Sequence, residues 1–189
     1  MGIALNTINE GDVGWFTKLD GDWTTLESQY VAQENADGNV VTVTSTTSET
    51  VLISSTTIPA NALAVGTVIS TFAGGSVFIA NMTTPSVTFT LRWGGLTGTV
   101  LATFTWNFSS GAATTFPWWW DFKIGGFSTG VSGGAVIGGW IGLGSNSFTS
   151  WDTGFVTLDT TTSKNLVWTV TPSLASVSTT QRSMTVDLG

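Results

Sequence analysis

The segment VTFTLRW, residues 87–93, carries the pattern that decides the fold. Its odd-numbered positions hold valine, phenylalanine, leucine and tryptophan, whereas its even-numbered positions hold threonine and arginine. Successive side chains of a strand point to opposite faces, so this period of two predicts a strand with one apolar face and one polar face. Such strands are typical of antiparallel sheets that pack one side on the core and expose the other to solvent.

The same pattern recurs along the rest of the chain. Residues 103–108 and 183–188 alternate in the same way. The further candidate strands are residues 40–44, 50–57, 63–72, 76–80, 116–124, 134–143, 154–158 and 165–171. Glycine pairs predict turns between several of them, at Gly74-Gly75, Gly94-Gly95, Gly125-Gly126 and Gly133-Gly134. About ten short strands with hardly any helical periodicity predict an all-β sandwich or barrel.

Charge divides the chain into two parts. Residues 1–49 hold eight of the twelve carboxylates and one base, Lys18, and so carry the whole net charge of −7. Charged residues make up 9% of the chain, against roughly 25% in an ordinary soluble domain. We therefore predict an acidic N-terminal arm, residues 1–38, and a β-sandwich domain, residues 39–189. With ten Trp and eleven Phe, the domain is expected to hide part of its surface in an oligomer.

Composition excludes several classes of function. Five Lys and Arg residues without a basic run predict no binding to nucleic acid or to an anionic membrane. Histidine and cysteine are both absent, which removes the usual general base, the thiol nucleophile and the commonest zinc ligands. The first residues lack the features of a secretory signal, and the longest apolar stretch, residues 135–143, is too short to span a bilayer. We expect a soluble protein that is not an enzyme and needs no cofactor.

Two aspartates are candidates for catalysis by a carboxylate pair. Glycoside hydrolysis needs only a pair of carboxylates, and Asp121 and Asp152 each follow a tryptophan on which a sugar could stack. Isolated aspartates at strand ends and turns more often accept hydrogen bonds from nearby backbone groups. A hydrolase is therefore the third and weakest hypothesis, and no catalytic residue is predicted.

The arm combines acids with aromatic residues, which an acidic disordered tail rarely contains. The arm residues expected to dock on a partner are Asp12, Trp15, Phe16, Asp20, Asp22, Trp23 and Tyr30. Residues 25–33 are compatible with one short helix or with a loop or strand. Asp20 and Asp22 depart from the spacing of an EF-hand calcium loop, because Thr25 stands where its glycine is required. We predict a solvated acidic turn there and no metal site.

The strongest local feature is the aromatic segment FPWWWDF, residues 116–122. In an extended strand its even-numbered residues, all aromatic, share one face, and Trp119 and Asp121 lie on the other. We expect the even-numbered face to be core. Trp119, Trp140 and Trp151 are expected either at a subunit interface or as stacking platforms for sugars, and packing is the commoner role of aromatics in sheets.

The segment ETVLISSTTIPANALAVGTVI, residues 49–69, resembles a segment of bacteriophage virion proteins in which an ETVL strand leads to IPANTLAxGDVI. In that pattern a GTxLATF strand follows, matched here by residues 98–104, and the resemblance covers residues 49–108. Thr67 stands where the pattern has aspartate. The resemblance implies a jelly-roll-like sandwich, commonly trimeric, displayed on a phage particle, and it implies no catalytic residue.

Together these features predict an all-β, antiparallel jelly-roll-like β-sandwich with an N-terminal extension arm. The expected function is that of a non-enzymatic phage virion structural protein, a capsid decoration or cement protein on the capsid surface. It would form a homotrimer and bind the major capsid protein through its arm. The alternative is a receptor-binding module of a tail or head fibre that recognises host-surface glycans.

Overall fold

The structure is a computed structural model that describes residues 40–54, 57–80, 84–109, 113–144 and 147–188, without the side chains of residue 54 and residues 147–153. The predicted arm, residues 1–38, lies outside these ranges, so its structure and its proposed boundary stay predictions. No helix within the described part of the chain has the length and apolarity that a membrane span requires.

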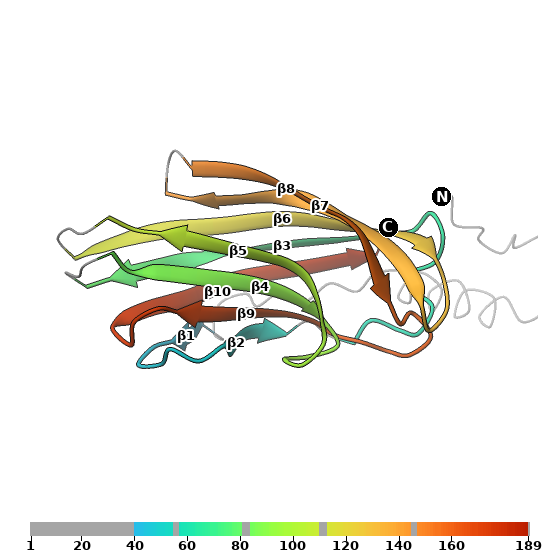
Figure 1. Cartoon of the computed structure of the whole chain (residues 1–189), viewed down its shortest axis with the longest axis horizontal. Helices are drawn as coiled ribbons and strands as arrows, with labels where there is room; N and C mark the ends of the chain where they lie inside the picture. The colour runs from blue at the N-terminus through green and yellow to red at the C-terminus, as the bar shows by residue number, and fades with distance from the viewer. Residues whose placement is uncertain (1–39, 55–56, 81–83, 110–112, 145–146, 189) are drawn as a thin grey trace, which may run out of the picture.

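The described residues form ten strands in two antiparallel sheets that face each other (Figure 1). The strands are β1 (Val41–Val43), β2 (Thr50–Ser54), β3 (Val68–Ile79), β4 (Ser86–Trp93), β5 (Thr99–Asn107), β6 (Thr114–Ser128), β7 (Gly133–Leu143), β8 (Ser147–Leu158), β9 (Leu166–Pro172) and β10 (Val177–Leu188). One sheet has the order β1-β10-β3-β6-β7-β8, and the other has the order β2-β9-β4-β5. The all-β sandwich predicted from the alternating pattern is confirmed.

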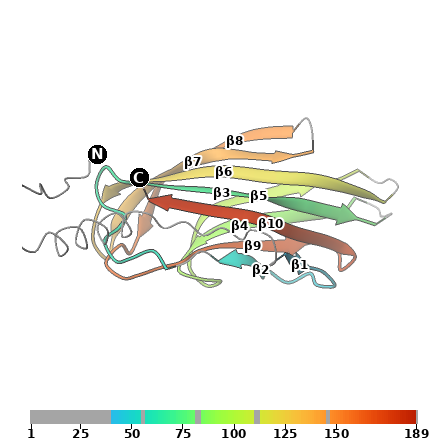
Figure 2. The same ribbon diagram turned by 180° about the vertical axis from the view of Figure 1, so that it is seen from behind.

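The strand pairing is that of a jelly roll. β1 pairs with β10, β2 with β9, β3 with β6 and β4 with β5, all antiparallel. These four pairs arise when one long antiparallel ribbon rolls up into two packed sheets of four strands each. The β7–β8 hairpin is an addition, which pairs with β6 and widens one sheet to six strands (Figure 2).

An aromatic cluster from both sheets forms the centre of the core. Trp120 of β6 stacks on Trp168 of β9, in the opposite sheet, with 3.6 Å between the ring centroids. Trp118 stacks on Trp120 at 4.4 Å, and Phe89 of β4 contacts both rings. The even-numbered face of β6 is thus core, as predicted, and so are the apolar residues of β4.

Two of the predicted glycine turns are wrong. Gly74 and Gly75 lie inside the continuous strand β3, and the predicted strand at residues 63–72 begins only at Val68. Gly125 and Gly126 lie inside β6. A Cβ at Gly126 would lie 2.0 Å from the Ala64 carbonyl oxygen, so the loop before β3 passes closely over β6 there. Gly75 and Gly126 permit close approach of another segment, which is the other common reason for glycine in a strand, whereas a Cβ at Gly74 or Gly125 would meet nothing closer than 3.5 Å.

The turn at Gly94-Gly95 is confirmed. Both glycines have positive φ, +94° and +95°, between β4 and β5. That region of backbone space is open to glycine at little steric cost. At Gly133-Gly134 the chain has already entered β7, and the turn occupies the four residues before it.

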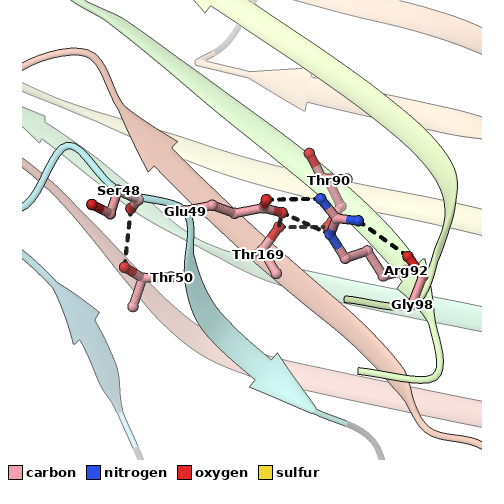
Figure 3. Close-up of polar contacts among 7 residues, drawn as sticks. All are labelled: Ser48, Glu49, Thr50, Thr90, Arg92, Gly98 and Thr169. Atoms are coloured by element: carbon pink, nitrogen blue, oxygen red, sulfur yellow. Dashed lines mark hydrogen bonds and ion pairs between the residues drawn. The ribbon is translucent and has the colours of Figure 1, made fainter. Parts of the chain in front are cut away.

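An ion pair and its hydrogen bonds link Glu49, the residue before β2, to β4 and β9 on the outer face of the four-stranded sheet (Figure 3). The Arg92 Nε and Nη2 groups of β4 each donate to one carboxylate oxygen of Glu49 at 2.7 Å. Thr169 of β9 donates to the same carboxylate, and Arg92 Nη1 donates to the Gly98 carbonyl at 3.1 Å. The hydrogen bonds from Arg92 hold the pKa of Glu49 below its ordinary value, against the opposing effect of partial burial.

We expect Glu49→Gln to lower the free energy of unfolding by about 1 kcal/mol near neutral pH, because a bidentate, charge-assisted pair is lost. The folded-state pKa of Glu49 is lowered, so its stabilisation is fully present above the unfolded pKa, near 4.5, and is lost as pH falls through the folded value. Urea unfolding of both proteins at about pH 7 and about pH 3 measures this. A difference of equal size at the two pH values would contradict the electrostatic origin.

Candidate functional site

The described residues contain no group of three or more acidic side chains that could hold a metal ion. Asp159 serves as a turn acceptor, since its carboxylate accepts hydrogen bonds from Thr161 and Thr162 at 2.7–2.9 Å. The Thr161 hydroxyl, followed by that of Thr162, holds the pKa of Asp159 well below its usual range. Of the two aspartates considered for hydrolysis, Asp121 lies on the outer face of β6, and the side chain of Asp152 is outside the described residues. The hydrolase hypothesis therefore gains no support.

The outer face of the six-stranded sheet is unexpectedly apolar. The sequence predicts polar outer faces, and that of the four-stranded sheet is largely polar, with the hydroxyls of Thr88 and Thr105 2.8 Å apart and only two exposed valines, Val51 and Val100, among its described residues. The six-stranded sheet instead exposes large apolar side chains. They are Val68, Phe72, Phe78, Phe127, Val136, Trp140 and Phe155. Large exposed apolar patches are typical of surfaces that contact another molecule.

One end of this face carries an apolar patch, formed by Val68, Phe127, Val136 and Phe155. The strand register places Val68, Gly125, Val136 and Phe155 side by side in one row across β3, β6, β7 and β8. Phe127 meets Phe155 edge to face, with 5.6 Å between the ring centroids, and both are more than half exposed, at 66% and 57%. No charged side chain interrupts the row.

A groove lies further along the same face. It has a volume of about 440 Å³ and is lined by Asp121 and Lys123 of β6 and by Gly138, Gly139 and Trp140 of β7. The register sets Asp121 beside Trp140 and Lys123 beside Gly138. Within the part of the chain that the structure describes, no hydrogen bond or ion pair is found for the side chains of Asp121 and Lys123, which both line the groove. We call this the Trp140 groove.

The structure distinguishes among the three tryptophans predicted as interface or sugar-stacking residues. Trp140 is 54% exposed and forms one wall of the groove. Trp119 is half-buried and packs flat on its own sheet, since a Cβ at Gly142 would lie 2.6 Å from its ring. The backbone of Trp151 pairs with Gly139 in β8, and its side chain is outside the described residues. Neither role is tested for any of the three.

The seven docking residues predicted in the arm lie outside the described residues, so the docking role stays a prediction. Sequence reasoning also missed Phe72, Phe127 and Phe155, because hydrophobicity alone places such residues in the core. In β3 the structure shows the reverse, with Phe72 outward and Thr71 buried. A usable signal is the repeat of glycine at outward positions 134, 138 and 142 of β7, since Gly134 leaves room for the Phe155 ring and Gly142 for the Trp119 ring.

No protein-family model matches the chain, and no curated protein matches it. One solved structure aligns with it, "Structure of infectious bursal disease virus Gx strain", at 12% sequence identity and a TM-score of 0.27. The alignment covers 84% of this chain and 41% of that one, so the chain spans less than half of the protein it matches. Similarity this low carries no argument about fold or function.

Proposed function

We propose that this protein is a non-enzymatic virion structural protein, a capsid decoration or cement protein of a phage. The observation that carries the proposal is the apolar patch on a jelly-roll domain with few charges. Exposed apolar surface on such a domain is stable in solution chiefly when another surface covers it. The resemblance of residues 49–108 to phage virion proteins points to the same class, and the fold by itself supports many functions.

In the proposed mechanism, binding of the protein shifts the equilibrium toward the assembled shell by mass action. Copies associate, as a homotrimer, through the apolar patch at one end of the outer face of the six-stranded sheet, and the acidic arm contacts basic residues of the major capsid protein. Burial of apolar surface between capsomers then stabilises the assembled shell relative to its separated parts. The carboxylates of the arm align the protein on the capsid and speed its association more than they raise its affinity.

Replacing both Phe127 and Phe155 with serine is expected to shift the protein from oligomer to monomer, with at least a tenfold rise in the dissociation constant. Sedimentation velocity over a range of protein concentrations measures this. Phe78→Ser is the matched control, because Phe78 is exposed on the same sheet at 41% and lies outside the patch. An unchanged oligomer in the double variant, or a monomeric wild type, would refute the proposed packing surface.

The location and copy number of the protein in purified particles test the function itself. A cement protein covers the shell, so hundreds of copies are expected by quantitative mass spectrometry, with antibody labelling distributed over the capsid. A handful of copies confined to the tail would overturn the proposal.

The Trp140 groove favours a second candidate function, a receptor-binding module of a tail or head fibre that recognises host-surface glycans. An exposed indole beside a carboxylate and an ammonium group suits a polar ligand with one apolar face, which the apolar patch does not. The location of the protein in the particle distinguishes the two candidate functions, because a receptor-binding module lies on a fibre or the tail and a cement protein covers the shell.

A further inference from the structure

We propose that the Trp140 groove is a binding site for a neutral saccharide, with Trp140 as the stacking platform and Asp121 and Lys123 as the hydrogen-bonding groups. This inference deepens the second candidate function and rests on it for its biological role. Its physical basis is separate from self-association, because the groove and the apolar patch use different residues. Val136 and Trp140 are four positions apart on β7, or about 13 Å along the strand.

The shape of the groove suits a flat, partly apolar ring. Gly138 lies on the outward face beside Trp140 and has no side chain to fill the space, and Gly139, where a Cβ would point toward Phe122, lines the groove with its backbone. Its volume of about 440 Å³ lies within the roughly 300–1,000 Å³ of sites for small molecules. A pyranose has one face of C–H groups, which pack against an indole, and a rim of hydroxyls.

A second aromatic residue stands on the other side of Asp121. The register places Phe72 of β3, Asp121 of β6 and Trp140 of β7 in one row across three neighbouring strands. Adjacent strands are about 4.8 Å apart, so Phe72 and Trp140 arise from backbones about 10 Å apart, with the carboxylate between them. Phe72 is 45% exposed. A sugar stacked on Trp140 therefore places its hydroxyls above Asp121 and its far edge toward Phe72.

The charges select the class of saccharide. Asp121 is an acceptor for two hydroxyl donors, and Lys123, two residues further on the same face, is a donor to a ring or hydroxyl oxygen. The lining holds one acid and one base, so it has no net charge. A sulfated or sialylated glycan would bring an anion to a site where the one base is already balanced by Asp121. Neutral glycans are the expected ligands.

The test is a glycan array with the full-length protein, followed by calorimetric titration with maltohexaose, cellohexaose and chitohexaose, and with sialyllactose and a heparin fragment as anionic comparisons. Binding to at least one neutral glycan is expected. Trp140→Ala and Asp121→Asn should each weaken it at least tenfold, because one removes the platform and the other exchanges a charged acceptor for a neutral amide.

Phe78→Ala is the matched control, an exposed aromatic of the same sheet whose position is about 20 Å from Phe72 along β3. It should leave glycan affinity unchanged, and thermal unfolding checks that all variants are folded. The proposal is overturned if the wild type binds no neutral glycan, if only anionic glycans bind, or if both groove variants bind as well as wild type. Sedimentation of the same variants keeps the two proposals apart, since loss of glycan binding with an intact oligomer supports this site alone.

Discussion

Replacing Trp120 with alanine is expected to lower the free energy of unfolding by about 4 kcal/mol. Trp120 is fully buried and stacks on Trp118 of its own strand and on Trp168 of the opposite sheet, with ring centroids 4.4 Å and 3.6 Å away. Its ring therefore links the two sheets. The Trp120 Nε1 group has no hydrogen-bond partner among the described residues, so the loss comes from burial and packing.

Trp140→Ala is the matched control for this prediction, since it removes the same side chain from an outward position that is 54% exposed. A change within about 0.5 kcal/mol is expected there. Urea or guanidinium unfolding of the two variants and the wild type gives both values. Equal losses in the two variants would mean that the inner aromatic cluster does not hold the sheets together.

The even-numbered face of β6 was predictable from the sequence because alternation is a property of the strand itself. Residues 116–122 contain aromatic residues at every even position, and any extended backbone places them together. The sandwich followed from the number of such strands, and the jelly roll from the resemblance of residues 49–108. The β7–β8 hairpin was predicted only as two strands, since nothing in a single strand says which edge it will join.

Glycines were misinterpreted where they lie inside strands. Gly75 faces Gln181 and Gly74 faces Ser183, and between these partners β10 holds an extra residue, a β-bulge. The bulge moves the inward positions of β10 from odd to even numbers, from Thr179 and Gln181 to Met184 and Val186. Such a change of register depends on the partner strand, so a single sequence does not reveal it.

The exposed aromatic residues on the outer face of the six-stranded sheet were not predicted, for a related reason. Hydrophobic pattern assigns large apolar residues to the core, and this assignment fails where the outer face of a sheet is itself apolar. Phe155 belongs to such a face, and its ring covers Gly134 of the neighbouring strand. The face therefore combines two kinds of surface, an apolar patch suited to another protein surface and a groove with both charges suited to a polar ligand. Only the groove contains residues that sequence reasoning had singled out, Trp140 and Asp121.

The adjacent glycines of β3 give the sharpest test of the packing inside the six-stranded sheet. A Cβ at Gly75 would lie 1.9 Å from the Thr180 carbonyl oxygen and 2.6 Å from the Trp118 ring, whereas a Cβ at Gly74 would meet nothing closer than 3.5 Å. Neither glycine has a positive φ, so the difference between the two sites is one of space and not of backbone conformation.

We therefore expect Gly75→Ala to cost about 3 kcal/mol or more, because the β10 backbone or the Trp118 indole must move away from the new methyl group. Gly74→Ala should range from no change to a gain of about 1 kcal/mol, because alanine restricts the unfolded chain and fits the strand. Denaturant unfolding of the two variants beside the wild type measures both. If Gly75→Ala proved as stable as Gly74→Ala, the close approach of Thr180 to Gly75 at the bulge would be wrong, and with it the register between β3 and β10 that builds the centre of this sheet.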